Sequence, residues 1–279
     1  MKMLKNHLYV VSTPIGNLDD ITLRAINVLK NSDIILCEDT RRSIKLLNHL
    51  KIKKKLISHH KFNEKKNLIH IIKHFNQGKI LSLISDAGTP LLSDPGKLLV
   101  NKCIENSIEV IPIPGASSIT SALSVSGFND QFLFYGFLPK TENELNNVLS
   151  ELSKNVYTQV FFAPSNKINF YIKKFKIFFS GRKILIAKEI TKLHEAFIRE
   201  DIDKLELFKS TFKGELTIVV SENTNNKKKI DEEKIVNKVK IYLKKYSLKD
   251  TVDLILETEK INKKTVYNLC LKVKNEKNH

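Results

Sequence analysis

Residues 80–90 read I-L-S-L-I-S-D-A-G-T-P. The mainly apolar run from Ile80 to Ser85 has the length of a buried strand, and Asp86, Gly88 and Pro90 after it favour a turn. In open parallel sheets, such loops at the carboxyl ends of strands bind ligands. The stretch therefore predicts an α/β fold with a ligand site directly after this strand.

The same alternation continues on both sides of this stretch, from Leu8 to about Tyr135. Short β-branched runs alternate with helical patterns, most of which open with a polar cap or a proline. Strand–helix–strand units of this kind build a mostly parallel sheet, so we expect one α/β domain. Its expected strands are residues 8–12, 34–38, 56–58, 80–85, 109–113 and 132–136, and its expected helices are residues 22–31, 41–50, 64–77, 95–106 and 117–126.

A second series of elements begins after the G-F-L-P stretch at residues 136–139 and predicts a second α/β domain. The lysine-rich run 222–229 is typical of a linker, and three short amphipathic helices are expected beyond it. We expect domains at residues 1–136, 137–225 and 226–279. The elements expected after residue 139 are helices at 142–154, 167–178, 231–245, 248–259 and 263–274, and strands at 158–163, 183–188 and 214–221.

The helical tail predicts a compact bundle with an apolar stripe and lysines on its other faces. A bundle of this kind is either a solvated cap or a carrier for a basic helix that contacts nucleic acid, and the pattern leaves both interpretations open. The expected stripe consists of Ile235, Val239, Leu243, Leu248, Val252, Ile255, Val266 and Tyr267.

The net charge of +17 on 279 residues makes nucleic acid a candidate partner. A cationic surface attracts phosphodiester backbones and releases their condensed counterions on binding. However, only five of the 47 basic residues are arginine, and an AT-rich genome also produces a chain rich in Lys, Asn and Ile. Charge alone therefore leaves the partner open.

Other features of the sequence argue against several classes of protein. No stretch approaches the roughly 20 apolar residues that cross a bilayer, and residues 1–11 lack the apolar core of a signal peptide, so we expect a cytoplasmic protein without membrane association. Neither a Walker motif nor G-x-G-x-x-G is present, which argues against nucleotide hydrolysis and nicotinamide binding. Cys37, Cys103 and Cys270 lie far apart in apolar segments and are expected to be free thiols in the core.

Three loops concentrate small and polar residues where parallel strands end: residues 12–17 (S-T-P-I-G-N), residues 85–90 (S-D-A-G-T-P) and residues 114–118 (P-G-A-S-S). Because the carboxyl ends of parallel strands share one edge of a sheet, these loops are expected to converge. Small residues let a ligand approach backbone amides and carbonyls, which suits an adenosine with an amino-acid tail. Nothing in the loops requires a metal.

Three further features have structural interpretations. His59 and His60 would point to opposite faces of a strand and have no partner at metal-ligand spacing, so both are expected to be structural or solvated. The phenylalanine cluster has the spacing of core packing rather than of base stacking. It consists of Phe161, Phe162, Phe175, Phe178 and Phe179. Asp94 precedes Pro95 and is expected to cap the following helix.

Six motifs occur in order along the chain: S-T-P-I-G-N-L-D-D-I-T, C-E-D-T-R, S-D-A-G-T-P-L-L-S-D-P-G, P-G-A-S-S, G-F-L-P and K-E-I-T-K. Together they resemble the tetrapyrrole methylase superfamily. They resemble most closely its ribosomal RNA branch, the bacterial small-subunit ribosomal RNA (cytidine-2′-O)-methyltransferases. Corrin and sirohaem enzymes carry G-x-G-P-G-D where this chain and the RNA branch have S-T-P-I-G-N, which argues against a tetrapyrrole substrate.

The resemblance implies two α/β domains of the tetrapyrrole methylase type followed by a small helical module, and a homodimer. It also implies S-adenosyl-L-methionine in the cleft between the domains, no metal, and a cytidine ribose of small-subunit (16S) ribosomal RNA as methyl acceptor, either in free RNA or in the small ribosomal subunit. The residues that the resemblance places against the cofactor are Pro14, Ala87, Gly88, Thr89, Leu92, Ser117, Ser118 and Ala163.

Transfer of a methyl group to a ribose hydroxyl needs a group that takes the hydroxyl proton. Glu38 and Glu189 follow expected strands and are the candidates for this catalytic role, with Lys188 adjusting the local charge. Arg41, Arg42 and Lys192 are candidates for binding RNA phosphates. Two structural alternatives stay open: Arg41 pairs with Glu38 or Asp39 at a helix start, and Lys188 and Glu189 form a surface ion pair.

Two other functions remain as alternatives to RNA methylation. The first keeps the cofactor but transfers the methyl group to a small molecule such as a tetrapyrrole, and its activity would be indifferent to salt. The second is an RNA-binding or assembly factor that retains the fold without turnover. RNA binding would weaken steeply as the salt concentration rises, which separates the first alternative from an RNA methyltransferase.

Overall fold

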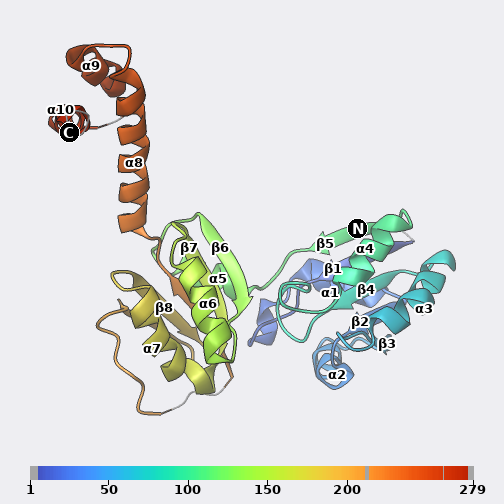
Figure 1. Ribbon diagram of the computed structural model, residues 1–279. Helices are drawn as coiled ribbons and strands as arrows, with labels where there is room; N and C mark the ends of the chain where they lie inside the picture. Colours follow the sequence, from blue (N-terminus) through green and yellow to red (C-terminus); the bar gives the residue numbers. More distant parts are fainter. Residues whose placement is uncertain (1–5, 211–213, 260, 276–279) are drawn as a thin grey trace. The chain divides into compact units, whose positions relative to one another are not determined.

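The computed structural model describes residues 6–210, 214–259 and 261–275, with the side chains of these residues except 224–232 and 275. The chain divides into two compact units (Figure 1). The larger unit holds the chain up to residue 149 together with residues 157–221, and the smaller unit holds residues 150–156 and the chain from residue 222 onward. Each unit is described by itself.

The first sheet of the larger unit is parallel throughout, with the strand order β3-β2-β4-β1-β5. Four helices follow the first four strands in turn, as the sequence predicts. The elements are β1 (His7–Val11), α1 (Leu23–Asn31), β2 (Ile34–Cys37), α2 (Thr40–His49), β3 (Lys55–Ser58), α3 (Glu64–Asn76), β4 (Leu81–Ile84), α4 (Lys97–Glu105) and β5 (Glu109–Ile113), with a short 3₁₀ turn η1 (Leu18–Asp20) after β1.

Helices cover both faces of this sheet. Leu29 of α1 and Leu47 of α2 pack on one face with Tyr9, and Phe75 of α3 and Leu99 of α4 pack on the other. The connections through α1 and α2 run toward β3, whereas those through α3 and α4 run toward β5. Because parallel crossovers are right-handed, connections that run in opposite directions place their helices on opposite faces.

The strand order decides which loops meet. The carboxyl ends of β4, β1 and β5 are neighbours, and they carry the three loops singled out in the sequence. The ends of β2 and β3 lie next along the same edge, beyond β4. One edge of the sheet therefore presents all five loops in a row.

The second sheet is mixed, with the strand order β6-β7-β10-β8-β9. Strands β6 and β7 are parallel, and the remaining pairs are antiparallel. The further elements of the larger unit are α5 (Ser118–Ser124), β6 (Phe132–Phe137), α6 (Glu142–Leu152, which extends into the smaller unit), β7 (Thr158–Pro164), the 3₁₀ turn η2 (Ser165–Lys167), α7 (Ile168–Phe178), β8 (Lys183–Lys188), β9 (Ala196–Asp201) and β10 (Glu215–Val220).

Strand β9 is absent from the sequence prediction. It is an edge strand whose residues are all exposed or only partly buried, and it ends in the polar run Arg199-Glu200-Asp201. Its pattern lacks the buried apolar alternation that reveals a strand in a sequence. The pairing with β8 supplies its backbone hydrogen bonds instead.

Each face of the second sheet carries a helix. Ile119 and Ala122 of α5 pack on one face against Val160, Leu185 and Val219. Phe161 points to the other face, where its ring lies 5.9 Å from that of Phe175 in α7. The predicted core role of the phenylalanine cluster is confirmed for Phe161, Phe175 and Phe179, which are buried.

The smaller unit contains the helices α8 (Thr224–Tyr242), α9 (Leu248–Thr258) and α10 (Lys263–Asn275). The linker prediction for residues 222–229 is wrong from Thr224 onward, because α8 begins there; Lys and Glu are good helix formers, and polarity alone does not mark a linker. The predicted stripe is confirmed except at Tyr267, whose side chain is exposed while Cys270 and Val273 join the core.

All three cysteines are buried and free, as the sequence predicts. Within the described ranges, we find no helix with the length and hydropathy that crossing a bilayer requires.

Candidate active site

The three predicted loops converge at the carboxyl edge of the first sheet. The backbone of Thr13 exchanges two hydrogen bonds with Gly88, with N···O distances of 2.9 and 3.0 Å. The hydroxyl of Thr89 lies 3.0 Å from that of Ser12 and donates to the Ala116 carbonyl at 3.3 Å. Gly88 has φ +79°, a left-handed conformation that glycine adopts without strain. The predicted convergence of the loops is confirmed.

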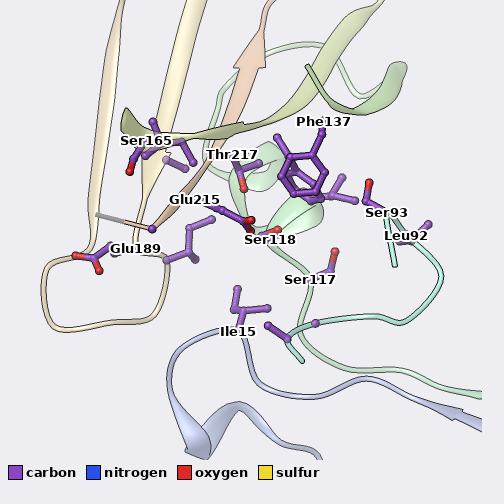
Figure 2. Close-up of a pocket in the computed structure, with 18 of the residues that line it drawn as sticks. Ile15, Leu92, Ser93, Ser117, Ser118, Phe137, Ser165, Glu189, Glu215 and Thr217 are labelled. Carbon is purple, nitrogen blue, oxygen red and sulfur yellow. The ribbon is translucent and has the colours of Figure 1, made fainter. Parts of the chain in front are cut away.

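A cavity of about 790 Å³ lies over these loops and is closed on its other side by residues of the second sheet. Figure 2 shows Ile15 and Ser117 on the side of the loops, with Glu215 and Thr217 across the space. Small residues alternate with apolar ones such as Phe137 and Phe162 around the lining. A lining of this kind suits an elongated ligand that combines a flat ring with hydrogen-bonding groups.

Strand register explains which second-sheet residues reach the cavity. Thr217 of β10 is paired with Phe162 of β7 and with Ala187 of β8, and all three line the cavity. The next position along β10, Leu216, is paired with Ala163 and Lys188. Phe162 and Pro164 line the cavity on either side of Ala163, and Ala187 and Glu189 do so on either side of Lys188. Because neighbouring residues of a strand point to opposite faces, the side chains of Ala163 and Lys188 are turned away from the cavity.

A tight contact joins the first loop to the loop after β8. The backbone amide of Asn17 donates to the Thr191 hydroxyl at 2.9 Å. A Cβ on Gly16 would lie 2.5 Å from Lys192 Cγ and 2.8 Å from the Ile190 carbonyl oxygen, so only glycine permits this approach. The wall of the cavity therefore depends on two segments that are distant in the sequence.

The loops that line the cavity hold non-glycine residues in left-handed backbone conformations. Leu91 and Ser93 have φ values of 72° and 67°, and Glu189 and Thr191 have φ values of 48° and 66°. Such conformations cost free energy and cluster at functional sites, where the surrounding structure enforces them. The strain marks these loops as candidates for function.

The charged side chains of the lining are Asp94, Glu189, Glu215, Arg42 and Lys192. Acidic groups thus outnumber basic ones in the cavity, although the whole chain carries a net charge of +17. The cavity is therefore less basic than the chain as a whole, as an environment for a positively charged ligand requires.

Asp94 lies in the cavity wall and does not cap a helix, so the capping prediction is wrong. Helix α4 begins three residues later, at Lys97, with Gly96 at its N-cap position. Burial, and next the negative charge of Glu38, raise the pKa of the Asp94 carboxyl to about 6. A carboxyl with such a pKa is ionised at neutral pH yet holds a proton more readily than an ordinary aspartate.

A second, more open cavity of about 470 Å³ lies along the same edge, at the ends of β2, β3 and β4. It is next to the first cavity, because Asp86 lines the second and Ala87 the first. Arg42 lines the first cavity and its Nη1 lies 3.2 Å from Oδ2 of Asp86. The lining consists of Glu38, Asp39, Thr40, Arg41, Ser58, His60, Lys61, Phe62 and Asp86.

Two carboxyl groups of this second cavity have shifted pKa values. Burial, with a smaller effect of the Asp86 charge, raises the pKa of Glu38. The pKa of Asp39 is held at about 2, mainly by the hydrogen bond from the Arg41 side chain. Arg41 Nη2 lies 2.6 Å from Asp39 Oδ2. The structure therefore contains the ion pair between Arg41 and Asp39 at the helix start that the sequence analysis gave as a structural alternative.

The predicted cofactor residues fall into two groups. Six line the first cavity, and two, Pro14 and Ala163, do not. Of the other predicted site residues, Glu189, Arg42 and Lys192 line the first cavity, Glu38 and Arg41 line the second, and Lys188 lines neither. The six are Ala87, Gly88, Thr89, Leu92, Ser117 and Ser118.

The sequence interpretation missed Glu215 and Thr217, and it assigned Asp94 to a helix cap although the Ser-Asp doublets at residues 85–86 and 93–94 offered two carboxylates. Glu215 and Thr217 carry no local signal, because the strand pairing of the second sheet brings them to the cavity.

The two histidines have different environments. His59 is buried with Nε2 3.6 Å from the Glu64 carboxylate, and burial lowers its pKa, whereas His60 lines the second cavity. Among the described residues, no three or more His, Cys, Asp or Glu side chains are grouped in a way that could hold a metal ion.

Comparison with known proteins identifies the family. Residues 7–206 match the model of the tetrapyrrole (corrin/porphyrin) methylases. Ribosomal RNA small subunit methyltransferase I of Rickettsia prowazekii is 40% identical over 278 residues, which cover 98% of this chain and 99% of the relative. The chain belongs to the tetrapyrrole methylase family.

A further relative and a solved structure are similar to this chain. Ribosomal RNA small subunit methyltransferase I of Mesomycoplasma conjunctivae is 45% identical over 233 residues, 83% of this chain and 94% of the relative. The crystal structure of uroporphyrin-III C-methyltransferase from Thermus thermophilus, complexed with S-adenyl homocysteine, aligns with a TM-score of 0.52. The alignment covers 77% of this chain and 97% of the transferase at 14% identity, which shows that the two proteins share a fold.

Proposed function

We propose that this chain is an S-adenosyl-L-methionine-dependent methyltransferase that methylates the 2′-hydroxyl of a cytidine in small-subunit (16S) ribosomal RNA. The observation that carries the proposal is the 40% identity, over nearly its whole length, to a relative named ribosomal RNA small subunit methyltransferase I. We infer that the acceptor is the ribose of a cytidine because the S-T-P-I-G-N loop and the accompanying motifs resemble the RNA branch of the family.

The lining of the first cavity fits S-adenosylmethionine. Thr89, Ser117 and Ser118 offer hydroxyl and backbone groups for the ribose and the amino-acid tail, while Ile15 and Phe137 offer apolar surface for the adenine ring. The acidic side chains around the cavity favour a sulfonium ion. When bound, S-adenosylmethionine supplies an electrophilic methyl group.

The ionised carboxylate of Asp94 is our candidate for the group that takes the hydroxyl proton. It lines the cofactor cavity at the point where the second cavity begins, beside Glu38 and Asp86. Glu38 and Glu189, the candidates from the sequence, remain alternatives for this role. Glu189 lies at the margin of the cavity in Figure 2, with its carboxylate directed away from Ser118.

The remaining roles follow from charge and position. We assign Arg41, Arg42 and Lys192 to the RNA backbone, because they stand at the two cavities and carry the cations that phosphates need. We further propose a cytoplasmic homodimer, which acts on ribosomal RNA or the small subunit. The three domains expected from the sequence, at residues 1–136, 137–225 and 226–279, also remain a proposal. The assignment of two elements within them is wrong: β6 and α5, expected in the first domain, belong with the second sheet, because β6 pairs with β7 and α5 packs on that sheet.

Two measurements test the proposed function. Calorimetry measures binding of S-adenosylmethionine to the purified protein, and a tritiated-methyl assay measures transfer to small subunits from a strain that lacks the gene. We expect micromolar cofactor binding and label in the ribose of one cytidine. An absence of label in ribosomal RNA from a protein that binds the cofactor would refute the proposed acceptor.

A further inference from the structure

The second cavity has the composition of a site for a single nucleotide. Its lining combines an aromatic ring, two cationic side chains and several carboxyl groups around about 470 Å³. This volume lies within the range of small-ligand sites in proteins. The position of the cavity next to the cofactor cavity makes it the place where a methyl acceptor would lie.

Phe62 is the most unusual residue of this lining. Its side chain is 93% exposed, although burial of such a ring would be favourable. The turn that carries it is nevertheless well defined: Asn63 Oδ1 accepts from the His60 amide at 2.8 Å, and Asn63 Nδ2 donates to the Ser58 carbonyl at 3.0 Å. A fixed turn therefore presents an aromatic face to solvent at the edge of the cavity.

An exposed ring on a fixed turn is suited to stacking against a nucleobase. Proteins recognise single-stranded RNA by stacking bases on aromatic side chains and binding the backbone with cations. His60 lies beside Phe62, with ring centroids 6.1 Å apart. Lys61 provides positive charge at the same cavity, together with Arg41, whose side chain also pairs with Asp39. The aromatic and cationic groups are thus placed together, as a nucleotide requires.

The carboxyl group of Glu38 supplies an acceptor for a base edge. Asp39 is bound to Arg41, and Asp86 accepts from the Asp39 amide and pairs with Arg42. No hydrogen bond or ion pair to the Glu38 carboxyl occurs among the residues that the structure describes. Cytosine presents an exocyclic amino donor that a carboxylate accepts, whereas uracil presents a carbonyl oxygen at this position.

We propose that the second cavity is the acceptor subsite, which receives one nucleotide turned out of the RNA with its base stacked on Phe62 and its exocyclic amino group donating to Glu38. This inference rests on the proposed function and specifies where its substrate binds. A nucleotide held there has its ribose at the junction with the cofactor cavity, where Asp86, Arg42 and Asp94 lie.

Steady-state methylation of small subunits from the deletion strain, with wild type, Phe62→Ala, Phe62→Tyr and Ile69→Ala, tests the subsite. We expect kcat/KM to fall about tenfold or more in Phe62→Ala, because the stacking surface is lost. Phe62→Tyr retains the ring and should stay within about threefold of wild type. Ile69→Ala removes a side chain on α3 that is 69% exposed and lines neither cavity, and it should match wild type.

Calorimetry of the same variants with S-adenosylmethionine controls for folding, and all should bind the cofactor as wild type does. Equal kcat/KM for Phe62→Ala and wild type would overturn the subsite and leave the proposed function standing. A wild-type protein that binds the cofactor but labels no ribosomal RNA would overturn both. Loss of cofactor binding in Phe62→Ala would assign the residue to the fold and also overturn the inference.

Discussion

The carboxyl groups at the junction of the two cavities differ in ways that their shared residue type does not reveal. Asp39 and Asp86 are engaged by arginine side chains, whereas Asp94 and Glu38 are partly buried near each other. Burial without a cationic partner disfavours the charged form, and a second carboxylate adds to the effect. Environment therefore raises the pKa of Asp94 to about 6, which makes it the carboxyl group suited to exchanging a proton near neutral pH, and it also raises the pKa of Glu38.

The first prediction concerns the pH dependence of methylation. If Asp94 accepts the proton, kcat/KM rises as Asp94 ionises, with an apparent pKa near 6. Asp94→Asn should lower kcat by about 100-fold or more, since general base catalysis contributes roughly that factor. Glu38→Gln removes a negative charge that raises the pKa of Asp94. The acidic limb of the pH–rate profile of this variant should therefore move to lower pH.

A pH–rate series with wild type, Asp94→Asn, Glu38→Gln and Glu189→Gln checks this prediction. Glu189→Gln tests the alternative base, because it changes a carboxyl at the margin of the same cavity. A loss of activity in Glu189→Gln alone, with Asp94→Asn unaffected, would move the role to Glu189.

The second prediction concerns stability. The pKa of Asp94 is raised from 3.8 to about 6 on folding, so the folded state binds the proton more tightly than the unfolded state. The ionised Asp94 carboxyl therefore lowers the free energy of unfolding most above pH 6. This loss of stability disappears below pH 3.8, where the group is protonated in both the folded and the unfolded state. Asp94→Asn should raise the melting temperature more at pH 8 than at pH 4, which thermal unfolding at both pH values measures. An equal shift at both pH values would contradict the raised pKa.

At the scale of elements, hydrophobic pattern and turn residues predict the first sheet and its three loops, because each element carries a local signal. Ala87, Gly88, Thr89 and Ser117 could be placed at the cavity for the same reason. The rest depends on tertiary pairing. The edge strand β9 has no local signal, and only the folded structure shows that the neighbours of Ala163 and Lys188 line the cavity while these two residues face away from it.

The third prediction tests the contact between the loop after β1 and the loop after β8. Thr191→Val keeps the shape of the side chain but removes the acceptor for the Asn17 amide, so the cofactor should bind several-fold more weakly. Gly16→Ala should weaken binding further, because its Cβ would collide with the Ile190 carbonyl. Thr141→Val, which removes an exposed bond to Glu144 away from the cavity, is the control.

Calorimetric titration with S-adenosylmethionine measures the dissociation constants of Thr191→Val, Gly16→Ala and the control Thr141→Val for comparison with wild type. Wild-type affinity in both Thr191→Val and Gly16→Ala would show that the contact does not support the cofactor site.

At the scale of the whole molecule, the first cavity is lined entirely by residues of the larger unit, while the helices α8, α9 and α10 form a core of their own. The fourth prediction follows from this division. Ile255→Ala empties a fully buried position and should destabilise the helical unit by about 2–5 kcal/mol without changing cofactor affinity. Ile241→Ala, 56% exposed on α8, should have little effect on either.

Hydrogen exchange resolved by segment measures the stability of the helical unit, and calorimetry measures the affinity for S-adenosylmethionine. Faster exchange in α9 and α10 of Ile255→Ala, with an unchanged dissociation constant for S-adenosylmethionine, is expected. A matching loss of cofactor affinity would show that the two units depend on each other.

The most direct test of the central claim is a map of ribose methylation in ribosomal RNA from cells with and without the gene. Mass spectrometry of nuclease fragments locates each 2′-O-methyl group. We predict that one 2′-O-methylcytidine of small-subunit RNA disappears in the deletion strain, returns with the wild-type gene and does not return with Asp94→Asn. An identical methylation map in the two strains would contradict the claim.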